Sequence, residues 1–216
     1  MTASTDKLPV VVLISGSGSN LQALIEASTR NEAAFFIRAV ISNRPTAKGL
    51  QRAAAAGIET RVIDHTDYPD RDSFDAELGD SIEAFGPGLV VLAGFMRILT
   101  DGFVARFYGR MLNIHPSLLP DFQGLHTHRR AIEAGVTEHG ASVHFVTAEL
   151  DGGPVIAQVR VPVEAADDES TLAERVLRRE HELLPQVVDW FARNRLRLRD
   201  SRIWLDGRVL ARPAQC

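Results

Sequence analysis

Short strand-like runs alternate with helical segments along the first half of the chain, and this order limits the possible folds more than any other feature. The strand-like runs lie at 7–19, 35–43, 59–64, 89–95 and 110–115. Most of them are apolar without polar alternation, which is typical of strands buried on both faces. Alanine-rich or amphipathic segments separate them. This β-α-β alternation predicts a mostly parallel sheet with helices on both faces.

The second half has a different pattern. Residues 140–163 predict two antiparallel strands around an acidic glycine loop, and residues 170–194 predict one long helix. Asp206-Gly207 predicts a type I′ turn within a C-terminal hairpin at 202–210. We therefore expect an α/β fold with a mostly parallel, doubly wound, Rossmann-like sheet and an antiparallel C-terminal extension.

No linker, repeat or low-complexity stretch divides the chain. We expect a single domain over 1–216. Its N-terminal half, 8–107, would bind a nucleotide or phosphate. Its C-terminal half, 108–216, would carry the catalytic residues, the acidic glycine loop and the terminal helix and hairpin.

Three local predictions concern helices. Ser19 with Gln22, and Thr171 with Glu174, have the spacing of capping boxes, in which side chains satisfy the free N–H groups of a helix start. Pro185 lacks an N–H donor, so it could kink the long helix or divide it in two.

Composition and charge exclude several classes of function. The 216 residues are 45% hydrophobic with a net charge of −4, so no overall field favours a nucleic-acid or membrane partner. The single cysteine, Cys216, allows no disulfide within the chain and fits a reducing cytoplasm. No apolar segment approaches the roughly 20 residues that span a bilayer. We expect a cytoplasmic protein whose residues 1–7 are disordered.

The stretch "LISGSGSNLQAL" at 13–24 runs from a strand through a glycine-serine turn into a helix. Successive N–H groups at such a helix start favour an anion, and Gly16 and Gly18 let a ligand approach the backbone. The lysine of a P-loop and the third glycine of a dinucleotide fingerprint are both absent. A single phosphate monoester is the most economical ligand. A tight turn without a ligand stays open, as does a nicotinamide phosphate held by Arg44.

Asn113 and His115 stand two residues apart at the end of the fifth expected strand, so their side chains share one face. Histidine exchanges protons near neutral pH, and an asparagine amide can donate to an oxyanion. The pair suits a tetrahedral intermediate at a carbonyl carbon. No serine elbow motif accompanies it, which favours attack by a substrate atom. A strand-end histidine with only local hydrogen bonds is the alternative.

Asp151 stands before two glycines and is a second candidate for the same site. A carboxylate beside His115 would stabilise the protonated ring and raise its pKa. An ordinary Asp-Gly-Gly turn is the alternative, because these residues are common in turns.

Four histidines lie close together in the sequence: His126, His128, His139 and His144. No H-E-x-x-H motif or nearby cysteine accompanies them, so we expect no metal site. The last of the four shares a strand face with Ser142, and we expect it to support the site or to lie in the core.

Six stretches, in order, span nearly the whole chain: "VVLISGSGSNLQAL", "ISNRPTAKGL", "VVLAGFMRIL", "LNIHPSLLPDFQGLHTH", "GASVHFVTAELDGGPVI" and "WLDGR". Together they resemble the phosphoribosylglycinamide formyltransferase family, the folate-dependent transformylases of purine synthesis. The Asn-x-His-Pro-Ser-Leu-Leu-Pro motif with a later Asp-Gly-Gly-Pro is specific to folate formyl-transfer and formyl-hydrolysis enzymes. "GLHTH" narrows the resemblance to the glycinamide ribonucleotide branch. Gln123 departs from it, since proline is expected there.

The resemblance implies a role for each matching residue. The catalytic residues would be Asn113, His115 and Asp151. The residues that hold the ribonucleotide would be Gly18, Ser19 and Asn20 at its phosphate and Glu180 at its glycinamide and ribose. The residues around the co-substrate 10-formyltetrahydrofolate would be Arg71 at its tail and Met96, Arg97, Ile98, Leu99, Thr147, Ala148, Glu149, Leu150 and Asp151 at its pterin.

The implied reaction is attack by the amine of 5′-phosphoribosylglycinamide on the formyl carbon of 10-formyltetrahydrofolate. His115 would be a protonated donor to the oxyanion, and Asp151 would raise its pKa. The resemblance also makes a homodimer an open possibility. A 10-formyltetrahydrofolate hydrolase is one alternative, but that class has a domain ahead of the catalytic one, for which a strand starting by Val10 leaves no room. An NADP-binding reductase is a more remote alternative.

Overall fold

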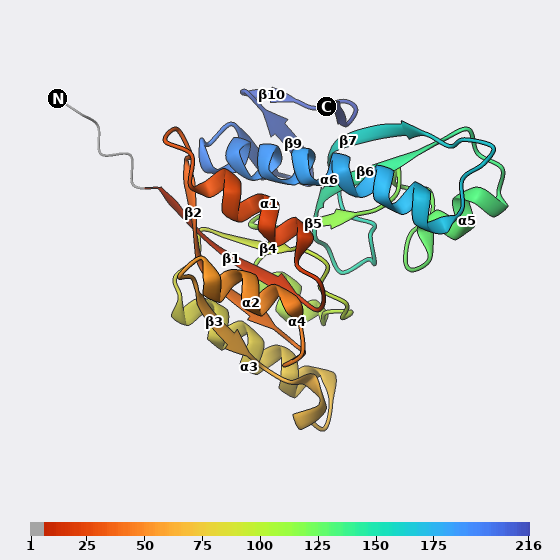
Figure 1. Ribbon diagram of the computed structural model, residues 1–216. Helices are drawn as coiled ribbons and strands as arrows, with labels where there is room; N and C mark the ends of the chain where they lie inside the picture. The colour runs from red at the N-terminus through yellow and green to blue at the C-terminus, as the bar shows by residue number, and fades with distance from the viewer. Residues whose placement is uncertain (1–6) are drawn as a thin grey trace.

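A computed structural model describes residues 7–216, and its centre is an eight-stranded sheet in the order β11-β7-β6-β5-β4-β1-β2-β3 (Figure 1). The strands are β1 (Leu8–Ile14), β2 (Phe35–Ser42), β3 (Glu59–Val62), β4 (Leu89–Leu92), β5 (Met111–His115), β6 (Glu138–Phe145), β7 (Val155–Pro162) and β11 (Ala214–Gln215). Neighbouring strands pair in parallel except where β6 meets β5 and β7. The expected α/β fold with a mostly parallel sheet is confirmed.

The strand order reverses at the middle of the sheet. The chain moves outward from β1 to β2 and β3, and then returns to the other side of β1 to form β4 and β5. In open α/β sheets ligands bind beyond the carboxyl ends of the strands at such a switch point. The loops that follow β1, β4 and β5 are therefore the place to look for a site.

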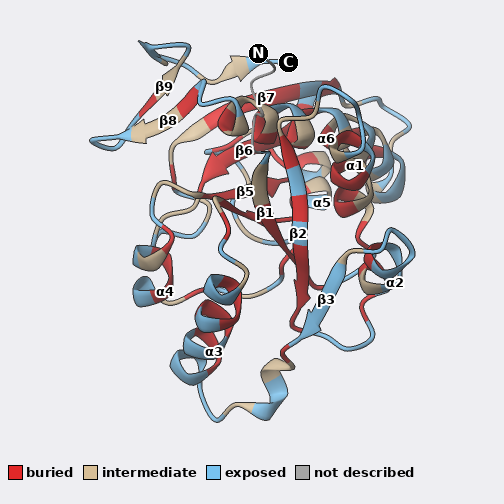
Figure 2. Ribbon diagram, turned by 90° about the vertical axis from the view of Figure 1, so that its left-hand side faces the viewer, coloured by how far each residue is buried: buried red, intermediate tan, exposed pale blue. Residues whose placement is uncertain are grey.

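Helices cover both faces of the sheet. They are α1 (Ser19–Ser28), α2 (Lys48–Ala55), α3 (Arg71–Ala84), α4 (Asp101–Arg106), α5 (Thr127–Glu133) and α6 (Glu169–Ala192), with a short 3-10 turn (His65–Asp67) before α3. Alternate residues of β1 face two separate cores: Val10, Val12 and Ile14 meet α1 and α6, whereas Val11 and Leu13 meet α3 and α4. This two-sided burial explains why β1 is apolar throughout (Figure 2).

The long helix α6 starts earlier than expected. The Asp168 carboxylate accepts the Thr171 N–H at 2.8 Å, and the Thr171 hydroxyl accepts the Asp168 N–H at 2.9 Å. The capping box is therefore Asp168 with Thr171, and the expected pair of Thr171 with Glu174 is wrong. Pro185 lies inside the helix without dividing it.

A three-stranded antiparallel sheet completes the C-terminal part. It contains β8 (Leu196–Arg199), β9 (Arg202–Leu205) and β10 (Arg208–Val209). Asp206 and Gly207 join β9 to β10 with φ angles of 51° and 76°. Positive φ at both turn residues is what a type I′ turn requires, as the sequence predicts.

Two further expectations concern the cytoplasmic location of the protein and the disorder of its N-terminal residues. Among residues 7–216, no helix is both long enough and apolar enough to cross a membrane. The expectation of disorder concerns residues 1–7, of which 1–6 lie outside the described residues.

The buried His139 of β6 should make folding stability sensitive to acid. Burial, with a smaller contribution from nearby His128, lowers its pKa to about 4. Between pH 6.5 and about 4, His139 is then protonated in the unfolded chain and neutral in the folded protein. The free energy of unfolding therefore falls as pH falls, by up to about 3 kcal/mol. Urea unfolding at several pH values should show a shallower acid loss in His139→Phe than in the wild type. Equal slopes would contradict this assignment.

Candidate active site

The loop between β1 and α1 presents free N–H groups at the switch point. Gly18 has a left-handed φ of 70° and precedes α1 without a side-chain cap, so the capping box expected of Ser19 and Gln22 is wrong. Within the described chain, the N–H groups of residues 17–21 meet no carbonyl acceptor, and the first closing bond runs from Gln22 N to Gly18 O at 2.9 Å. Free N–H groups at a helix start suit an anion.

The predicted ribonucleotide residues Asn20 and Glu180 meet each other. Asn20 Nδ2 donates to Glu180 Oε2 at 2.7 Å, and both side chains are buried. Burial raises the pKa of Glu180, although the Asn20 hydrogen bond opposes the shift. Because the Asn20 amide donates to Glu180, its backbone N–H is the donor that stays free at the helix start.

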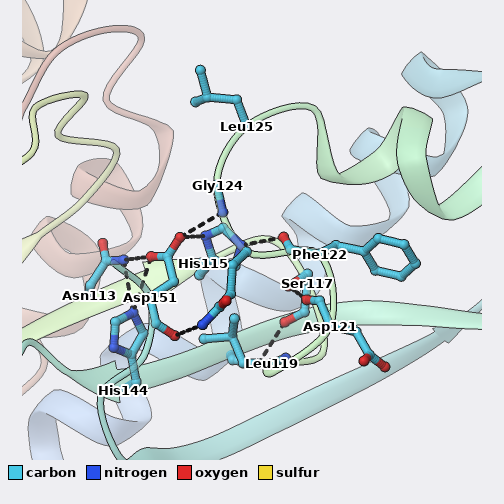
Figure 3. A network of polar contacts seen from close by, with 12 residues as sticks. Asn113, His115, Ser117, Leu119, Asp121, Phe122, Gly124, Leu125, His144 and Asp151 are labelled. Atoms are coloured by element: carbon cyan, nitrogen blue, oxygen red, sulfur yellow. Dashed lines mark hydrogen bonds and ion pairs between the residues drawn. The ribbon is translucent and has the colours of Figure 1, made fainter. Parts of the chain in front are cut away.

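The three expected catalytic residues also come together. Figure 3 shows Asn113 and His115 on β5 beside Asp151, which lies in the loop after β6. The Asp151 carboxylate lies 3.3 Å from His115 Nδ1 and accepts from Asn113 Nδ2 at 3.4 Å. Gly124 N donates to the same carboxylate at 2.9 Å. One buried carboxylate therefore joins a strand end and two loops.

His144 orients the amide of Asn113. Its Nδ1 lies 3.0 Å from the carbonyl oxygen of Phe145, which can only accept, so Nδ1 carries the proton of the neutral ring. Nε2 is then an acceptor and receives Asn113 Nδ2 at 3.1 Å. The supporting position expected for His144 on its strand face is confirmed.

Opposing effects set the charge of the pair. Burial lowers the pKa of His115, and the Phe122 carbonyl and Asp151, which both favour the charged ring, do not offset it. Burial acts to raise the pKa of Asp151, but the hydrogen bonds that its carboxylate accepts, among them the one from Gly124 N–H, outweigh burial and leave that pKa below its usual range. At pH 7 the ligand-free site therefore holds a neutral imidazole beside a carboxylate. Asp151 acts on His115 in the expected direction, but burial decides the outcome.

The backbone around Asp151 is held close to β6. Asp151 itself has a left-handed φ of 50°. A Cβ atom on Gly153 would collide with the carbonyl oxygen of Phe145, so no larger residue fits at this position. The second glycine of the motif is therefore needed for close approach, which the bare turn alternative does not require.

Two buried polar side chains hold the loop that follows β5. Ser142 Oγ accepts Leu119 N at 3.0 Å and donates to Ser117 O at 2.6 Å. Gln158 Nε2 donates to Leu119 O at 2.9 Å and to Ser142 Oγ at 3.0 Å. The bond between Leu119 and Pro120, left open by the sequence, is cis.

The sequence analysis missed Gln158. A glutamine within the apolar run 155–159 was the available signal, because a side chain buried there must find hydrogen-bond partners. It supports the loop that also carries Phe122, whose carbonyl oxygen lies 3.0 Å from His115 Nε2.

A pocket adjoins the expected catalytic residues. It lies between the loop after β4 and the loop after β6. Its lining residues are Leu92, Phe95, Arg97, Ile98, Leu99, Val104, Asn113, His144, Val146, Thr147, Ala148, Glu149, Leu150 and Asp151. Most of the residues expected to contact a folate thus share one cavity with Asn113.

Two expected folate residues, Met96 and Arg71, do not line this pocket. Met96 belongs to the same loop, but its side chain is 59% exposed, and its N–H donates to Ser15 Oγ at 2.7 Å. Arg71 is an exposed residue at the start of α3, close enough to Asp75 to affect the pKa of that carboxyl. Their assignment to the folate stays a prediction.

The histidine cluster has other contacts. The rings of His128 and His139 meet edge to face with their centres 5.2 Å apart, and Phe122 packs on the second ring at 5.8 Å. Over residues 7–216, no three His, Cys, Asp or Glu side chains are placed to hold one metal ion.

Gln123 Nε2 donates to the Asp151 carbonyl at 3.3 Å, so its amide adds a contact that proline could not make.

Known proteins resemble this chain over most of its length. The formyl transferase family matches residues 8–188 of the chain. Phosphoribosylglycinamide formyltransferase from Escherichia coli K12 is 53% identical over 201 residues, which are 93% of this chain and 95% of that protein. The chain belongs to the formyl transferase family. Within this family it groups with the phosphoribosylglycinamide formyltransferases, and the resemblance inferred from the sequence is confirmed.

Other relatives of this formyltransferase agree. The human trifunctional purine biosynthetic protein adenosine-3 is 46% identical over 195 residues, which are 90% of this chain and 19% of that longer protein. The structure of phosphoribosylglycinamide formyltransferase from Coxiella burnetii is 50% identical, with a TM-score of 0.93 over 97% of this chain and 99% of that one. The formyltransferase enzyme class is confirmed, and these relatives favour neither the hydrolase nor the reductase.

Replacement of Gln158 tests the support of the loop. Gln158→Met keeps the volume but leaves the buried Leu119 carbonyl without this donor, so we expect a loss of about 1–3 kcal/mol in the free energy of unfolding. Gln51→Met, on the exposed side of α2, is the matched control and should change it by less than about 0.5 kcal/mol. Equal effects of the two variants in urea unfolding would show that Gln158 does not anchor the loop.

Proposed function

We propose that the chain transfers the formyl group of 10-formyltetrahydrofolate to the primary amine of 5′-phosphoribosylglycinamide. The products would be 5′-phosphoribosyl-N-formylglycinamide and tetrahydrofolate, in purine synthesis. The observation that carries the proposal is that Asn113 and Asp151 line one pocket, with His115 held 3.3 Å from the Asp151 carboxylate, beside the switch point that holds the N–H-rich loop. The relatives named phosphoribosylglycinamide formyltransferase support the same formyl acceptor.

The pocket suits the flat pterin of the donor. Apolar side chains such as Phe95 and Val104 can pack on its ring, and the backbone of residues 147–151 offers polar groups at the ring edge. When bound, the donor supplies the formyl carbon that the amine attacks and N10 as the leaving atom. We propose that Arg97, Ile98 and Leu99 line the opposite wall.

His115 is suited to move the proton that the reaction displaces. A neutral ring has one N–H for two acceptors, Asp151 Oδ2 at Nδ1 and the Phe122 carbonyl at Nε2. A proton accepted at Nε2 gives both acceptors a donor. We therefore propose that His115 takes the proton that the amine loses on attack and returns it to N10, rather than starting as the protonated donor expected from the sequence.

Asn113 is suited to stabilise the oxyanion. Its Nδ2 has two hydrogens, of which one is held by His144 at 3.1 Å and the other makes a long 3.4 Å contact with Asp151. The second hydrogen is the one that can turn to a developing negative charge. Asp151 stabilises His115 while that ring carries the proton.

Both halves of the proposed domain contribute to the reaction. The half at 8–107 would bind the phosphate through Gly18, Ser19 and Asn20, with Glu180 of the other half near the glycinamide. Holding both substrates supplies the proximity contribution, worth up to roughly 7–11 kcal/mol in good cases. The homodimer and the cytoplasmic location stay predictions.

A two-substrate assay tests the function. The folate absorbance should change when 10-formyltetrahydrofolate and 5′-phosphoribosylglycinamide are both present, and should not change without the amine. Asn113→Ala should lower kcat by about 10²–10³ with the fold intact, as removal of an oxyanion donor does. His115→Ala should lower kcat by about 10²–10⁴, as removal of a general acid–base does.

Two outcomes would contradict the proposed reaction, and a third would contradict the role of Asn113. A change in folate absorbance without the amine would indicate a hydrolase. No change in absorbance, with or without the amine, would exclude this pair of substrates. Near-normal turnover in Asn113→Ala would leave the transferase standing but remove Asn113 from the oxyanion site.

A further inference from the structure

Helix α2 contacts the proposed phosphate loop through two consecutive carbonyl groups. Gly49 N donates to Gly16 O at 3.1 Å, and Arg52 Nε donates to Ser17 O at 3.0 Å. The first contact comes from the backbone of the first turn of α2, and the second from a side chain one turn later. The loop is thus held from one side by a helix that contributes none of the residues expected to bind substrate.

These two bonds fix the direction of the loop's N–H groups. In a trans peptide the C=O of one residue and the N–H of the next point in opposite directions. With the carbonyls of Gly16 and Ser17 turned toward α2, the N–H groups of Ser17 and Gly18 point away from it. These belong to the run 17–21 whose N–H groups meet no carbonyl acceptor in the described part of the chain.

The contact leaves no room for side chains. A Cβ atom on Gly18 would lie 2.5 Å from Gly49 Cα, and one on Gly49 would lie 2.5 Å from Ile14 Cδ1 and 3.1 Å from Gly18 Cα. The start of α2 is therefore seated directly on the loop backbone. Small movements of α2 must move the loop, because no flexible side chain separates them.

Arg52 also places a positive charge beside a loop that has no lysine. Its side chain lines one cavity together with Ser19 and Gln22, and its Nη1 lies 3.5 Å from Gln22 Oε1. Arg52 is an exposed residue, and the shorter of its two hydrogen bonds is the one to Ser17 O at 3.0 Å.

We propose that Arg52 is a positioning residue for the ribonucleotide substrate. Together with Gly49 N–H it turns two loop carbonyls toward α2, so that the loop's free N–H groups face the phosphate before substrate arrives. This inference rests on the proposed function of the loop. It assigns to α2 a part in substrate binding that the sequence motif at 13–24 does not contain.

The test compares Arg52→Gln with Lys48→Gln, which removes one exposed positive charge from the same helix without touching the loop. Arg52→Gln should raise KM for 5′-phosphoribosylglycinamide about 10-fold, the effect of one hydrogen bond, with kcat, the folate KM and the melting temperature nearly unchanged. Arg52→Lys can still donate to Ser17 O and should recover most of the loss. In the ligand-free protein, the NMR amide signals of Ser17 and Gly18 should shift in Arg52→Gln and not in Lys48→Gln.

Several results would overturn the proposal. Equal KM changes in Arg52→Gln and Lys48→Gln would indicate charge at a distance, and equal rises in both substrates' KM values would indicate a general structural defect. A raised KM with unmoved loop amides would indicate direct contact with the phosphate. A wild-type protein without formyl transfer would instead refute the proposed function, which keeps the two failures distinct.

Discussion

The site depends on the contacts that the buried carboxylate of Asp151 makes. Its two oxygens contact His115 Nδ1, Asn113 Nδ2 and Gly124 N, so it ties the end of β5 to the loop after it. A buried carboxylate without such partners would be strongly unfavourable, so the arrangement forms as a whole. The same contacts keep Asp151 charged while burial keeps His115 neutral, and the site is therefore ready to accept a proton.

The rest of the structure places this centre and the loops proposed to bind substrate at one edge of the sheet. The reversal of strand order beside β1 brings the loops after β1 and β4 together, and a hydrogen bond from Met96 N to Ser15 Oγ joins them. Helix α2 holds the loop after β1. Ser142 and Gln158 hold the loop after β5. The backbone proposed to bind substrate is thus fixed by residues that need not touch substrate.

Much of this follows from local sequence pattern, and some of it does not. The apolar run of β1 and the two-residue spacing of Asn113 and His115 report strand burial and strand face directly, because both depend on local periodicity. The N-cap of α6 at Asp168 was missed, since two overlapping residue pairs had capping-box spacing. The meeting of Asp151 with His115, and the support from Gln158 and Arg52, depend on contacts between distant segments that no spacing encodes. The net pKa of His115 depends on burial, which the motif alone does not give.

Titration of the His115 ring by NMR in the ligand-free protein tests this account most directly. We predict a pKa below 6.5 in the wild type, because burial outweighs the favourable contacts of the charged ring. Asp151→Asn keeps the shape but removes the negative charge, so the pKa should fall further. A wild-type pKa above 6.5, or a pKa that Asp151→Asn leaves unchanged, would contradict the central role given to this carboxylate.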